Sequence, residues 1–116
     1  MRLDGWKAAA VAAGMGLGLV LAAGASAEEV SEADAAEAKS IYDARCTTCH
    51  GPGGKGDGAA AAALNPKPRD LTSDEWQKSV TDEHIEKIIL GGGPAVGMSP
   101  LMPPNPDLNA KPGVVD

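Results

Sequence analysis

The sequence contains few of the residues that usually build a hydrophobic core. It has no phenylalanine, one tyrosine and two tryptophans among 116 residues. Much of the remaining apolar content is alanine, which buries little area, and burial stabilises a fold by only about 25 cal/mol per Å². Small domains usually need an additional stabilising group. The composition therefore predicts that something other than side chains fills the centre of this fold.

Strand patterns are also missing. No stretch alternates apolar and polar residues convincingly, and no internal repeat is present. Residues 32–46 and 81–91 instead carry apolar residues at helical spacing, with hydroxyl caps and acidic first turns. Glycines and prolines make residues 51–58 a loop. Further along the chain, Thr72 or Ser73 could cap a short turn around Trp76. We expect an all-α fold with long loops.

The chain has fewer basic than acidic residues. Acidic residues outnumber basic ones by 16 to 10, and the formal net charge is −6. This balance argues against nucleic acid or an anionic membrane as the partner, and it favours docking to a basic protein surface. Solubility alone is an equally good explanation of the charge.

A long apolar run occurs only near the N-terminus. Arg2 and Lys7 precede the uncharged run 8–23, which leads to the small-x-small pattern at residues 25–27. This arrangement is typical of an export signal cleaved after Ala27. An uncleaved anchor is the alternative, but a spanning helix needs about 20 apolar residues. We expect residues 1–27 to be a signal peptide and residues 28–116 to form one small exported domain without a membrane contact.

The two cysteines are confined to one motif, "CTTCH", at residues 46–50. A thioredoxin-like dithiol would need a preceding strand, and a zinc site would need a fourth ligand. The third interpretation is covalent haem, for which Cys-x-x-Cys-His is the attachment signature. Haem would also fill the poorly supplied core, and export would fit because the thiols are attached to haem outside the cytoplasm. The sequence therefore favours haem, with dithiol chemistry and zinc as alternatives.

At this point the chain resembles the class I c-type cytochromes, in particular short bacterial periplasmic ones. The likeness rests on "IYDARCTTCHGPGGKGDG", "LNPKPRDLT" and "DEHIEKIILGGGPAVGMSPLMPP", and spans roughly residues 33 to 108. It implies a cytochrome c fold around one haem c, bound covalently through Cys46 and Cys49, with His50 as the proximal ligand.

The resemblance implies roles for two further residues. Tyr42 is similar to the residue that packs near the haem edge. Pro66 is similar to the proline whose carbonyl accepts the other ring proton of the ligand histidine, and Pro68 is the alternative. His84 lies among charged residues, so we expect a solvated surface histidine.

The sixth ligand is expected to be Met102. The only candidates after residue 50 are Met98 and Met102. Met102 precedes Pro103 and Pro104, which stiffen the segment that must hold sulfur against iron. Class I cytochromes likewise have the axial methionine before proline. Met98 follows a glycine and is expected to be a flexible apolar filler.

One feature departs from the family pattern. Family members end with a helix that crosses the first helix, whereas here residues 111–116 provide about one turn of such a helix. We therefore expect the closing helix to be truncated, with the apolar face of residues 35–42 partly uncovered.

The resemblance implies a function without enzymatic activity. We expect one-electron transfer between periplasmic redox proteins, with imidazole and thioether filling both axial positions of the iron. Two alternatives are a haem subunit of a specific dehydrogenase or oxidase, and a gas-binding haem protein with an open sixth position.

Overall fold

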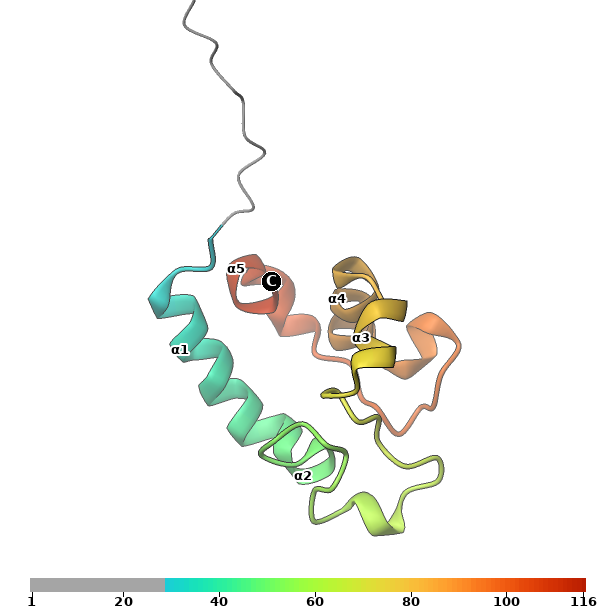
Figure 1. Cartoon of the computed structure of the whole chain (residues 1–116). Coiled ribbons are helices and arrows are strands. Elements are labelled where there is room, and N and C mark those ends of the chain that lie inside the picture. Colours follow the sequence, from blue (N-terminus) through green and yellow to red (C-terminus); the bar gives the residue numbers. More distant parts are fainter. Residues whose placement is uncertain (1–28) are drawn as a thin grey trace, which may run out of the picture.

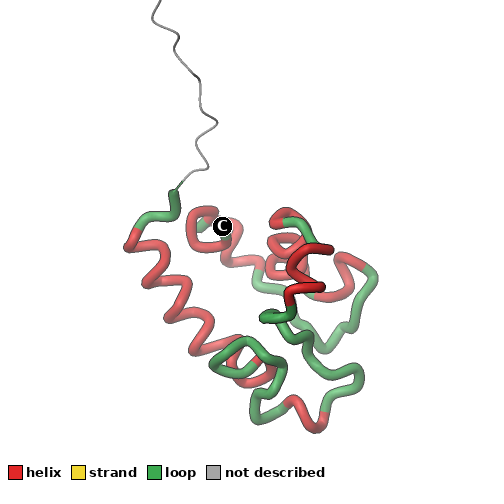
Figure 2. The backbone as a smooth tube through the Cα atoms, in the orientation of Figure 1, coloured by secondary structure: helices red, strands yellow, loops and turns green. Residues whose placement is uncertain are grey.

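The computed structural model describes residues 29–116, and the expected signal peptide lies outside this part. Every regular element within residues 29–116 is helical, as the tube in Figure 2 shows. The all-α prediction is therefore confirmed. No helix in this range combines the length and apolarity needed to cross a membrane.

The first helical segment runs without a break into the cysteine motif. Ser31 caps α1 (Glu32–Ile41) by accepting a hydrogen bond from the Asp34 N–H, at 3.1 Å. A π-helical turn, η1 (Tyr42–Cys46), follows, and α2 (Thr47–His50) completes the run. The predicted helix is confirmed, but the π-helical turn was not expected. Such turns are rare and frequently lie at functional sites.

The later elements begin where hydroxyl side chains cap them. Ser73 accepts from the backbone of Trp76 at the start of α3 (Asp74–Ser79), and Thr81 accepts from that of His84 at the start of α4 (Asp82–Gly91). Both caps agree with the sequence pattern. The remaining elements are short: η2 (Ala61–Ala63), η3 (Gly93–Val96), η4 (Pro106–Ala110) and α5 (Pro112–Val115).

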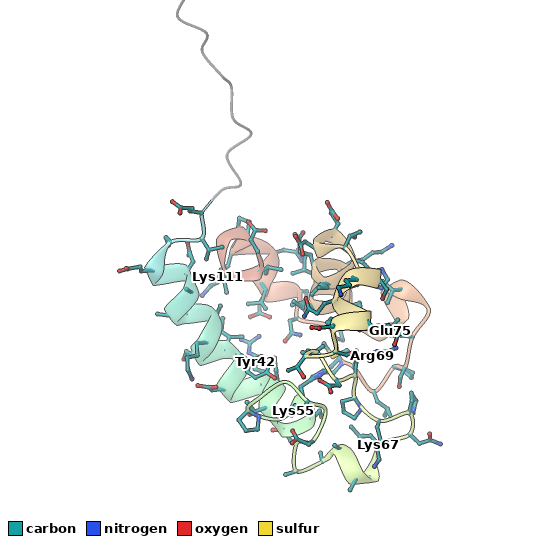
Figure 3. The ribbon with its side chains drawn as sticks, in the orientation of Figure 1. Tyr42, Lys55, Lys67, Arg69, Glu75 and Lys111 are labelled. Carbon is teal, nitrogen blue, oxygen red and sulfur yellow. The ribbon has the colours of Figure 1, made fainter. Side chains whose placement is uncertain are left out.

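The elements form an open arc (Figure 1). α1 and α2 make one side, and α3 and α4 lie opposite. α5 packs against α1, while η4 connects α5 to α4. Lys111 forms an ion pair with Glu37 of α1, and Figure 3 shows its side chain at this junction. The short C-terminal helix therefore contacts the first helix, although it covers only part of it.

Side chains alone do not make a core in the described residues. The buried apolar residues are Ala61, which is 5% exposed, and Leu108, which is 4% exposed. Ile85, Ile88 and Ile89 of α4 are only half-buried. The helices of the described residues therefore bury little apolar area against one another.

A backbone clip holds the end of α2. The N–H groups of Gly56, Gly58 and Ala60 donate to the carbonyls of residues 50, 49 and 48, at 2.8, 3.1 and 2.9 Å. These carbonyls belong to the last turn of the helix, where no intrahelical donor remains. Alternate N–H groups of the loop thereby bond to the cysteine motif, and these bonds fix the conformation of the motif.

The clip predicts a steric requirement for glycine at position 58. A Cβ there would overlap the backbone oxygens of Thr47 and Thr48. We expect Gly58→Ala to lower the free energy of unfolding by about 1–3 kcal/mol, measured by denaturant titration of the purified protein. Gly53→Ala is the matched control, because its Cβ would meet only the Lys55 side chain, at 4.0 Å. Equal losses in the two variants would contradict the clip.

Candidate functional site

Two thiols and an imidazole share one helical turn. Cys46 ends the π-helical turn, while Cys49 and His50 lie in α2. Residues three apart on a helix project from the same face. Both thiols are free and half-buried. The motif therefore presents two parallel attachment points with an imidazole directly after them.

The electrostatics do not favour dithiol chemistry. Burial raises the pKa of the Cys46 thiol, Arg45 partly offsets this rise, and Cys49 adds to it. A catalytic thiol needs the opposite shift, because the thiolate is the nucleophile. Within residues 29–116, no group of three or more His, Cys, Asp or Glu side chains is placed to hold a metal ion. The geometry therefore gives no support to a zinc site of protein ligands there.

His50 carries the orphaned polar atom of the site. Burial lowers the pKa of its imidazole, and the backbone of Arg69 raises it in part. Nδ1 is the single buried side-chain nitrogen or oxygen of the described chain without a hydrogen-bond partner, so the approach of Arg69 falls short of a well-formed bond. A neutral imidazole is the form that binds a metal. The ring is thus suited to be a ligand.

Tyr42 links the first helical segment to the chain directly after His50. Its hydroxyl donates to the Gly51 carbonyl oxygen at 2.7 Å. Burial raises the pKa of Tyr42, with smaller contributions from Cys46, Asp43 and Asp57, so the hydroxyl keeps its proton. Tyr42 begins η1, and Figure 3 shows it on the side of the first helical segment that faces the rest of the molecule. A contact between Tyr42 and a haem edge stays a prediction.

The two candidate prolines lie in different surroundings. Pro66 is exposed and follows a cis peptide bond. Pro68 is half-buried, and its carbonyl approaches Gly56 of the clip loop so closely that a Cβ at Gly56 would overlap it. The backbone that acts on His50 belongs to Arg69, next to Pro68. The role assigned to Pro66 stays a prediction.

The segment that carries Met102 is tied to the end of α4. The Gly93 N–H donates to the Met102 carbonyl at 3.0 Å, and the Met102 N–H donates to Ser99 at 3.2 Å. Gly92 has a φ of +72°, and a Cβ there would lie 2.7 Å from the Met102 oxygen. Met102 is half-buried, whereas Met98 is 49% exposed. The two methionines thus differ in both exposure and anchoring.

His84 lies near α3 and the Met98 segment. It is half-buried and lines a hollow of about 330 Å³ together with Arg69, Trp76 and Met98. The expectation of a solvated surface histidine stays a prediction; residues of α3 and the Met98 segment border this part of α4. The sequence showed only the charged neighbours of His84 along its own helix.

These residues fit a covalently attached haem. Two free thiols on one face, a neutral imidazole with an orphaned nitrogen, and helices that bury little apolar area among themselves match the needs of a flat apolar group with a central metal. The cysteine spacing is that of the haem attachment signature.

Comparisons with known proteins agree with this fit. The family model named Cytochrome c matches residues 35–112. Cytochrome c-554(547) of Halothiobacillus neapolitanus is 37% identical over 78 residues, which cover 62% of this chain and 76% of the relative. Cytochrome c-555 of Prosthecochloris aestuarii is 31% identical over 90 residues, which cover 72% and 81%. No solved structure matches the chain significantly.

The matched region contains the cysteine motif, its clip loop and the Met102 segment. Family membership implies covalent haem c, and Cys46 and Cys49 have the spacing that its attachment requires. Haem-based electron transfer is the activity that this family supports. The chain is therefore a class I c-type cytochrome, a member of the cytochrome c family.

Proposed function

We propose that this protein is an exported one-electron carrier in which His50 and Met102 bind the iron of a single haem c. The observation that carries the proposal is the clipped Cys46–His50 turn, whose buried imidazole nitrogen lacks a partner. The Met102 segment is the second support, since the Gly93 N–H, just after α4, donates to the Met102 carbonyl and the Asn105 N–H donates to the carbonyls of Ile89 and Leu90 in α4.

The ligand pair determines what the bound group does. Haem supplies a metal that gains and loses one electron, and a thioether opposite an imidazole favours the reduced form. The chain holds the imidazole neutral by burial and limits the freedom of Met102 by anchoring its carbonyl to Gly93. A site with both axial positions occupied transfers electrons without binding a substrate, so we propose a carrier and not an enzyme.

The acidic surface and the N-terminal residues support a location and a class of partner. The formal net charge of −6 favours redox proteins with a basic docking surface. The composition of residues 1–27 supports export to the periplasm. These two features make the protein a candidate shuttle between periplasmic redox proteins.

Covalent attachment predicts that the haem stays with the polypeptide after denaturation. We expect haem peroxidase staining of the denatured band to survive extraction with acidified acetone, because thioether bonds resist this treatment. The Cys46→Ser/Cys49→Ser variant is the control and should lose the stain. Extraction of haem from the parent protein would refute covalent attachment.

The small side-chain core predicts that the polypeptide needs haem in order to fold. Far-UV circular dichroism of Cys46→Ser/Cys49→Ser should show little helix, since Ala61 and Leu108 alone are buried apolar residues of the described chain and cannot offset the conformational entropy of folding. A cooperative thermal transition in this variant would contradict the expectation.

The axial assignment predicts different effects at the two methionines. Met102→Ala should abolish the weak near-infrared charge-transfer band between sulfur and ferric iron and open the reduced iron to carbon monoxide. Met98→Ala should retain the band, because Met98 is exposed.

The reverse result would exchange the roles of Met98 and Met102. A parent protein without the band, which binds carbon monoxide readily, would instead support a gas-binding function. Both variants keep the cysteine motif intact, so haem content measured in each sample controls for failed attachment.

A further inference from the structure

An ion pair joins two distant segments at the surface of the protein. The Arg45 Nη1 atom lies 2.9 Å from Asp107 Oδ2 and 3.0 Å from Oδ1. It also lies 3.4 Å from the side-chain oxygen of Asn105. Arg45 belongs to the π-helical turn, and Asp107 belongs to η4. The guanidinium therefore connects the first helical segment to residues 105–107.

Asn105 ties the same segment to α4. Its backbone N–H donates to the Ile89 carbonyl at 3.0 Å and to Leu90 at 3.2 Å. Its side-chain amide donates to the Ile89 carbonyl at 3.1 Å. One residue thus holds the end of α4 and accepts from Arg45, so residues 105–107 form a junction between the two sides of the fold.

The junction is adjacent to the two parts of the haem site. Arg45 immediately precedes Cys46, and Asn105 lies three residues after Met102. We propose that Arg45, Asn105 and Asp107 form a clasp that positions the Met102 segment relative to the cysteine motif and limits its opening. The inference rests on the proposed His50 and Met102 ligation, which it extends to three positioning residues.

The other two ion pairs of the described residues do not reach residues 105–107. Lys39 pairs with Asp43 within the first helical segment, and Lys111 pairs with Glu37 near the start of that segment. Exposed ion pairs contribute little to global stability. A loop that opens on its own is more sensitive, because its opening free energy is small compared with that of the whole fold.

The clasp is tested by how readily the ferric protein binds added imidazole, a neutral ligand that can bind only after Met102 leaves the iron. Its apparent affinity rises in proportion to the fraction of molecules with the segment open. We expect Asp107→Ala to strengthen imidazole binding roughly two- to fivefold.

Asp43→Ala is the matched control. It removes the same side chain from an exposed ion pair that lies within one helical segment, and it should leave imidazole binding unchanged. Arg45→Asp alone should behave like Asp107→Ala, whereas the exchange Arg45→Asp/Asp107→Arg should restore the parent affinity.

Hydrogen exchange separates a local clasp from a general loss of stability. In Asp107→Ala, the amides of Met102 and Asn105 should exchange several-fold faster, while that of Gly58 in the clip should keep its parent rate. Acceleration of all three amides by one factor would overturn the proposal. If the parent shows the sulfur–iron band and Asp107→Ala binds imidazole no more tightly than the parent, the proposal is also overturned. A parent without that band would instead refute the axial assignment itself.

Discussion

The fold depends on burial of apolar area that the polypeptide's own side chains do not supply. α1 and α2 stand on one side, α3 and α4 on the other, and the buried apolar residues of the described chain are Ala61 and Leu108. Burial of apolar area is the main favourable contribution to folding. A large flat group fixed by two bonds to the α2 side supplies that area to the helices around it. Cofactor and core are therefore the same structural element in this protein.

Several contacts hold the conformation of the cysteine motif. The π-helical turn brings Cys46 into line with α2, the clip loop occupies the carbonyls after it, and the Tyr42 hydroxyl holds Gly51. These contacts restrict the chain on both sides of His50, while the thiols of Cys46 and Cys49 stay free. On the opposite side, Gly92 and Gly93 let the Met102 backbone approach the end of α4. Each side of the site is thus rigid locally, and residues 105–107 connect them.

The local elements could be predicted from the sequence because their signals are local. Ser31, Ser73 and Thr81 cap helices where hydroxyls precede acidic residues. The cysteine motif identified the cofactor because its chemistry is specific. Contacts between distant residues could not be predicted in this way. Nothing near Arg45 in the sequence indicates Asp107, the π-helical turn has no compositional signature, and the half-buried setting of His84 depends on α3 and Met98.

The claim that haem serves as the core is tested most directly by denaturant unfolding of the holoprotein. Far-UV circular dichroism and visible haem absorption are recorded on the same samples. A fold built around the cofactor should lose its helices and its native haem environment in one transition, so the two curves should coincide. Helical signal that persists at denaturant concentrations where the haem absorption has already become that of the unfolded protein would contradict the account.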